Sequence, residues 1–110
     1  MELTELKTEN CLIVSISGRL DTTNYTTLEK KLMNWIDKGE QHILVDCAKL
    51  NYVSSSGLRV FLVALKKITP LNGKFVLCSL QKNIIEIFDI SGFSSIFEIY
   101  STKEEALAAF

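Results

Sequence analysis

Three consecutive serines, Ser54, Ser55 and Ser56, are the side chains of this chain best placed to react or to bind a ligand. They lie between a β-branched apolar run at residues 43–45 and an apolar helical pattern that begins at Leu58, so their hydroxyls should stand at a helix N-terminus. Unpaired backbone N–H groups and the positive end of the helix dipole favour a phosphate there. The hydroxyls could cap the helix, bind phosphate or carry it covalently. Position alone favours capping, because serine is a preferred N-cap residue.

Nucleophilic catalysis by a serine is a competing use of the same position. The chain has no G-x-S-x-G elbow. Its one histidine, His42, opens the strand that precedes the serines and should lie at the opposite end of the sheet, where it cannot activate them as a base. We therefore expect no catalytic residue and no enzymatic activity.

Composition narrows the class of protein. The chain has 110 residues, of which 47% are hydrophobic and 23% charged, and only one proline, which predicts one globular domain over residues 1–110. A net charge of −1 provides no basic field for direct nucleic-acid binding. The apolar runs at residues 12–16 and 60–65 are far shorter than the roughly 20 residues that span a membrane, and no signal peptide is evident. We expect a cytoplasmic protein without membrane insertion.

Cys11, Cys47 and Cys78 are odd in number and widely spaced, and each lies beside an apolar run. This pattern is typical of reduced thiols that pack as small hydrophobic side chains. No CxxC pair is present, and His42 is far from any cysteine cluster. The sequence therefore predicts no metal site and no cofactor.

Strands and helices alternate along the chain and must position the serines. Strands are predicted around residues 3–7, 12–16, 43–45, 75–78 and 97–99; helices are predicted between an N-cap at Asp21 and Gly39, over residues 58–68 and 82–89, and after the capping-box pattern of residues 101–105. This alternation indicates an α/β fold with parallel pairing through right-handed crossovers and a starting hairpin.

The helix after the serines carries more apolar surface than one stripe facing a sheet requires. Val60, Val63 and Ala64 form this surplus. We expect a neighbouring helix to cover it, because small domains rarely leave large apolar patches exposed. If it were uncovered, it would be a docking surface beside the serines.

From end to end, the chain resembles a STAS domain of the stand-alone anti-sigma factor antagonist type. The resemblance rests on five segments in order: Ser-Gly-Arg-Leu-Asp at 17–21, Leu-Val-Asp at 44–46, Val-Ser-Ser-Ser-Gly-Leu at 53–58, Gly-Lys at 73–74 and Ile-Ser-Gly-Phe at 90–93. It implies a small single-domain fold with a mixed sheet of about five strands, an N-terminal hairpin and about four helices.

In that family the serine segment commonly reads Asp-Ser-Ser-Gly-Leu, and a partner kinase phosphorylates the first serine. Alignment on Gly57 implies Ser55 as the acceptor, with Ser54 and Ser56 as alternatives. This chain has Ser54 at the acidic position, and Arg59 where many members have a small residue. Because Ser55 and Arg59 are four residues apart on a helix, a guanidinium could pair with a phosphate.

The resemblance implies a switch between partners. The unphosphorylated form would bind an anti-sigma factor that is also a serine kinase and so release the sigma factor, and a metal-dependent serine phosphatase would reset the cycle. The residues implied in partner binding are Asp21, Ser54, Ser56, Gly57 and Arg59. Gly57 also has a structural explanation, close backbone approach in the first helical turn. The alternative function is that of a STAS accessory subunit in a transporter or sensory complex, without phosphorylation.

Overall fold

A computed structural model describes all residues from 1 to 110, and it shows a five-stranded mixed sheet in the order β1-β2-β3-β4-β5. The strands are β1 (Glu2–Lys7), β2 (Leu12–Leu20), β3 (His42–Val53), β4 (Lys74–Cys78) and β5 (Glu98–Tyr100). The first two strands form an antiparallel hairpin, and all later neighbours pair in parallel. The predicted hairpin and the predicted parallel pairing are therefore confirmed.

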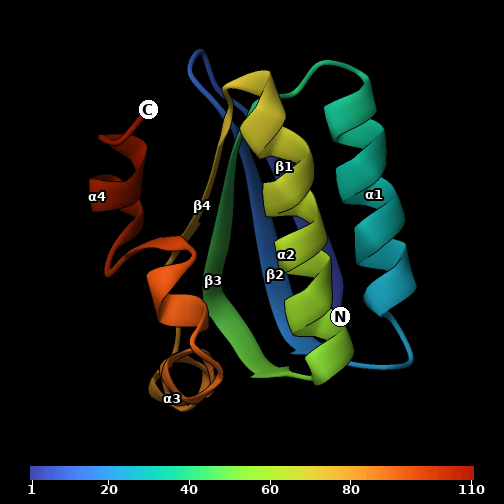
Figure 1. The fold of residues 1–110 in the computed structure, drawn as a ribbon, viewed down its shortest axis with the longest axis vertical. Coiled ribbons are helices and arrows are strands. Elements are labelled where there is room, and N and C mark those ends of the chain that lie inside the picture. Colours follow the sequence, from blue (N-terminus) through green and yellow to red (C-terminus); the bar gives the residue numbers. More distant parts are fainter.

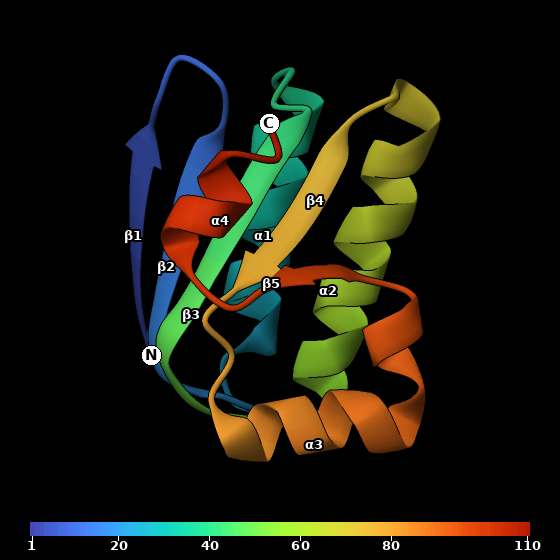
Figure 2. The same cartoon turned by 90° about the vertical axis from the view of Figure 1, so that its left-hand side faces the viewer.

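Four α-helices connect or follow these strands. They are α1 (Tyr25–Asp37), α2 (Ser55–Ile68), α3 (Lys82–Ser91) and α4 (Lys103–Leu107), with short 3-10 turns at η1 (Thr69–Leu71) and η2 (Phe93–Ser95). Figure 1 shows α1 and α2 side by side over one face of the sheet, whereas Figure 2 shows α4 on the other face. None of the helices is both long and apolar enough to cross a membrane.

The sheet is buried on both faces at its centre. Ile43, Leu44 and Val45 of β3 are fully buried, as a continuous apolar run in a central parallel strand predicts. Ile43 and Val45 belong to a core of 23 residues to which α1, α2 and α3 all contribute. Leu44 belongs to a smaller cluster of six residues, to which α4 contributes Ala106. β3 is therefore packed on both faces, and it leads directly to the serines at its carboxyl end.

The apolar surplus of α2 is covered by its neighbour. Val60 and Ala64 are buried and Val63 is half-buried, because α1 packs alongside α2. The first of the two interpretations of this surface is confirmed. No free apolar stripe remains on α2 beside the serines.

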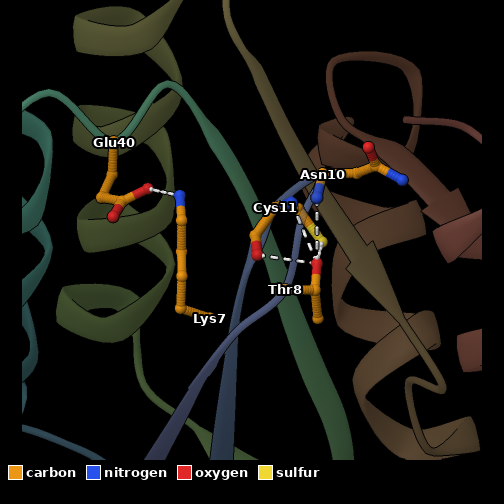
Figure 3. Close-up of polar contacts among 5 residues, drawn as sticks. All are labelled: Lys7, Thr8, Asn10, Cys11 and Glu40. Atoms are coloured by element: carbon orange, nitrogen blue, oxygen red, sulfur yellow. Dashed lines mark hydrogen bonds and ion pairs between the residues drawn. The ribbon is translucent and has the colours of Figure 1, made fainter.

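The end of the sheet remote from the serines is closed by the β1–β2 turn. Thr8 Oγ1 accepts hydrogen bonds from the backbone N–H groups of Asn10 and Cys11, and Lys7 forms an ion pair with Glu40 (Figure 3). His42 lies at this end, where its ring centroid is 6.0 Å from that of Phe110. The predicted separation of the histidine from the serines is confirmed.

The three cysteines are free and buried, as expected of packed thiols. Burial raises the pKa of the Cys47 thiol well above its usual value, and it also raises the pKa of Cys78. Both thiols therefore remain protonated at neutral pH and act as small apolar side chains.

Candidate functional site

Ser54 is the residue that joins the sheet to α2. Its N–H donates to the Leu20 carbonyl at 2.9 Å, which ties the segment to the end of β2. Its extended backbone places Oγ where it accepts a hydrogen bond from the N–H of Gly57 at 3.2 Å. The sequence predicted that a serine hydroxyl caps this helix without showing which one; in the structure that residue is Ser54.

The other two serines, Ser55 and Ser56, differ from Ser54 and from each other in their environments. Ser55 is the first residue of α2 and is exposed, whereas Ser56 is half-buried. Neither hydroxyl forms a hydrogen bond within the protein, while that of Ser54 is occupied by the cap. Of the three serines, Ser55 is the one that combines a free hydroxyl with an exposed position.

Gly57 lets the first turn of α2 sit directly on the sheet. A Cβ at this position would lie 2.7 Å from Cγ of Leu20 and 2.9 Å from Cγ2 of Val53, closer than side chains tolerate. The predicted close backbone approach is confirmed. Gly57 is buried, so the role visible in the structure is to position the serines above it.

Asp21 does not cap the first helix, and that prediction was wrong. The helix begins at Tyr25, with Asn24 at the N-cap position and no side-chain cap. Instead, Oδ1 of Asp21 accepts hydrogen bonds from Oγ1 of Thr23 at 2.6 Å and from its N–H at 2.9 Å. These bonds close a turn between the strand and the helix, which delays the helix start.

The carboxylate of Asp21 is held in its charged form. The hydroxyl of Thr23 has the largest effect, and the N–H of Thr23 and the nearby Arg19 add to it, so the pKa of Asp21 is lowered from its usual value. Nε of Arg19 lies 3.6 Å from Oδ2 of Asp21. A fixed negative charge therefore stands at the end of β2, beside the segment that Leu20 ties to Ser54.

Tyr52 is a residue of this edge that the sequence analysis missed. The guanidinium carbon of Arg19 lies 4.1 Å from the centroid of the Tyr52 ring, a cation–π contact. The two residues are paired across β2 and β3, but only after two register shifts in that pairing. Because bulges of this kind leave no clear mark in the sequence, the contact had no usable signal.

A shallow depression lies between the N-terminal ends of α1 and α2. Its volume is about 160 Å³, and it is lined by Tyr25, Glu29, Ser56, Arg59 and Val60. Arg59 is exposed and has no carboxylate within ion-pair distance, in contrast to Arg19. The first turn of α2 contains no acidic residue. The depression is thus polar, and it is lined by one cation, Arg59, and one carboxylate, Glu29.

Comparison with known proteins identifies the family of this chain. The STAS domain family matches residues 4–106. The chain is 41% identical, over all of its length and 95% of the relative's, to BtrV of Bordetella bronchiseptica, named as a candidate anti-sigma factor antagonist. This chain belongs to the STAS-domain family of anti-sigma factor antagonists. It is also 32% identical to the anti-sigma-B factor antagonist of Bacillus subtilis, over 87% of each chain.

Solved structures show the same fold. A candidate anti-sigma factor antagonist of Thermotoga maritima superposes with a TM-score of 0.94 at 21% identity, over 97% of this chain and 92% of that one. The antagonist SpoIIAA matches in its unphosphorylated form with a TM-score of 0.77, at 18% identity over 98% and 96% of the two chains. The phosphorylated form of SpoIIAA, from Bacillus, matches with 0.78, at 20% identity over 98% of both. The predicted STAS fold is confirmed.

Proposed function

We propose that this anti-sigma factor antagonist is a protein-binding switch controlled by phosphorylation of Ser55. In the unphosphorylated form it binds an anti-sigma factor that is also a serine kinase, and the sigma factor is released. The observation that carries the proposal is the division of labour among the serines: Ser54 caps α2, which leaves the hydroxyl of Ser55 free and exposed. Ser54 and Ser56 are the alternative acceptors.

The chemistry of the switch is a phosphoryl transfer in which the partner is the enzyme. The kinase transfers the γ-phosphoryl group of ATP to Oγ of Ser55, the hydroxyl proton passes to a base of the kinase, and ADP leaves. A metal-dependent serine phosphatase hydrolyses the phosphoester to serine and inorganic phosphate. The antagonist itself supplies only the acceptor, and it acts in the cytoplasm without a cofactor of its own.

The effect of the phosphate follows from its charge. It adds about −1.5 to −2 charges at a helix N-terminus, where backbone N–H groups and the helix dipole tolerate an anion. The fold should therefore survive, and SpoIIAA supports this, since its phosphorylated and unphosphorylated forms match this chain about equally well. A partner fitted around neutral serines would instead meet a poorly compensated charge. A loss of about 3 kcal/mol weakens binding more than a hundredfold.

Ser54 occupies the position where the family commonly has an aspartate, and this exchange is compatible with a phosphorylation switch at Ser55. Aspartate and serine are both good N-cap residues, so the exchange retains the cap of α2 while removing a negative charge from the neighbourhood of Ser55. The kinase partner must then recognise this segment without that carboxylate. Asp21, which lies beside the segment and stays ionised, provides the fixed negative charge at the same edge.

The test compares three variants with the wild-type protein in the presence of its host's anti-sigma factor kinase and ATP. Ser55→Ala should bind the kinase with wild-type affinity and take up no phosphate, whereas Ser54→Ala and Ser56→Ala should both be phosphorylated. Phosphate uptake by Ser55→Ala would move the acceptor to another serine. Recovery of transporter subunits in place of a kinase, in a pull-down from the native host, would replace the switch by the accessory role.

A further inference from the structure

Arg59 stands apart from the other arginine of the chain. Arg19 is paired with Asp21 and stacked on Tyr52, so its positive charge already has partners within the protein. Arg59 is exposed, forms no ion pair and has no aromatic contact of that kind, although Glu29 lines the same depression. A guanidinium without a partner is available to a new anion at little cost.

Arg59 follows the serines by about one turn of α2. Helical side chains lean toward the helix N-terminus and meet residues three and four positions earlier, which here are Ser56 and Ser55. Ser56 and Arg59 line one depression of about 160 Å³, so the Arg59 side chain lies beside the residue that follows Ser55. A phosphate on Ser55 would be within reach of the guanidinium, and such pairs are strong because both groups are charged.

Resting on the function proposed above, we propose that Arg59 changes partner when Ser55 is phosphorylated. In the unphosphorylated protein its guanidinium is free to bind an acidic side chain of the anti-sigma factor. After phosphorylation it pairs with the phosphate on its own helix. The modification therefore acts twice on the docking surface, by adding an anion and by withdrawing a cation.

The intramolecular pair is tested on the antagonist alone, with phosphoserine installed at position 55 during synthesis and verified by intact mass. The second pKa of the phosphate, normally about 6, is followed by phosphorus NMR. Pairing with Arg59 lowers it, so Arg59→Ala should raise it by roughly 0.2–0.7 pKa unit, as expected for an exposed charge pair. Arg59→Lys should restore part of the shift.

Lys66→Ala is the matched control. It removes one positive charge from the same helix, seven residues beyond Arg59 and therefore about 10 Å farther along the axis. It should leave the phosphate pKa unchanged. Equal shifts in Arg59→Ala and Lys66→Ala would show a general effect of net charge and overturn the pair.

The intermolecular half is tested with the unphosphorylated protein and the host's anti-sigma factor kinase. Arg59→Ala should weaken binding at least about fivefold and reduce its dependence on salt, whereas Lys66→Ala should do neither. Unchanged affinity in Arg59→Ala would overturn the change of partner. Because the phosphoserine is installed chemically, failure of the kinase to modify Ser55 would contradict the proposed function and leave the NMR result independent.

Discussion

The helices α2 and α4 begin with the same capping bond but differ in what surrounds it. Oγ of Ser54 accepts from the N–H of Gly57 at 3.2 Å, and Oγ1 of Thr102 accepts from the N–H of Glu105 at 3.1 Å. In both, a hydroxyl three residues upstream satisfies one free N–H of the first turn. A hydroxyl at a helix start is therefore no evidence of function in itself.

The rest of the first turn separates the two helices. The start of α4 contains Glu104 and Glu105, so its positive dipole end already has its anions, whereas α2 has no acidic residue there. At α2, Ser55 is left over after capping and Arg59 is unpaired. A phosphate at the start of α4 would meet two carboxylates in the first turn, whereas the first turn of α2 contains none. The candidate site therefore differs from the start of α4 in two ways: its first turn has no carboxylate, and it is followed by an arginine without an ion pair.

The largest expected effect is on the affinity for the partner, and it should differ between the N-terminal ends of α2 and α4. Ser55→Asp should weaken binding to the anti-sigma factor kinase by about 3 kcal/mol, more than a hundredfold, because it puts a charge into the docking surface. Ser101→Asp, next to the cap of α4, is the matched control and should change affinity less than about twofold. Titration calorimetry measures both. Equal losses in the two variants would contradict a docking surface centred on α2.

The next largest effect is on the free energy of unfolding, and it concerns the residue three positions after the N-cap of α2 and of α4. Gly57→Ala should lower the free energy of unfolding by about 1–3 kcal/mol, because the new Cβ is driven into Leu20 and Val53. Glu105→Ala, at the corresponding place in α4, is exposed and should cost less than about 1 kcal/mol. Urea denaturation with unchanged slopes checks both. A Gly57→Ala protein as stable as wild type would mean that α2 can lift from the sheet.

Removal of the caps tests which serine does the capping. Ser54→Ala and Thr102→Ala should each cost about 0.5–2 kcal/mol in the free energy of unfolding. Ser55→Ala should stay within about 0.5 kcal/mol of wild type, since its hydroxyl has no partner in the protein. The same urea titrations compare them. If Ser55→Ala were as damaging as Ser54→Ala, the hydroxyl of Ser55 would not be free.

The smallest effect concerns Asp21 and pH. Its folded pKa is lowered below the usual 3.8, so its contribution to stability is complete above that value and is lost as pH falls through the folded pKa. Thr23→Val removes the hydroxyl with the largest effect on this pKa and should reduce the loss of stability between about pH 5 and pH 2. Urea midpoints across that range measure it. An identical pH dependence in both proteins would show that Thr23 does not hold the carboxylate.

Much of the fold was predictable because burial repeats with the period of each element. The run at residues 43–45 predicted a strand covered on both faces, and the surplus apolar surface of α2 predicted a covering helix. The role of Asp21 was predicted wrongly because a carboxylate can either cap a helix or close a turn. The sequence does not show which backbone N–H group lies nearer to that carboxylate. The pairing of Arg19 with Tyr52 depends on register shifts that appear only in three dimensions. The same holds for Ser54 and Ser55, whose different tasks depend on where the helix begins.

Phosphorylation of Ser55 in the cell is measured by phosphopeptide mapping of the protein isolated from its own host through growth and stress. We expect phosphate on Ser55 in at least one of these states and none on Ser101, because the start of α4 already has the carboxylates of Glu104 and Glu105. Phosphate confined to Ser54 or Ser56, or an unmodified segment in every state, would contradict it.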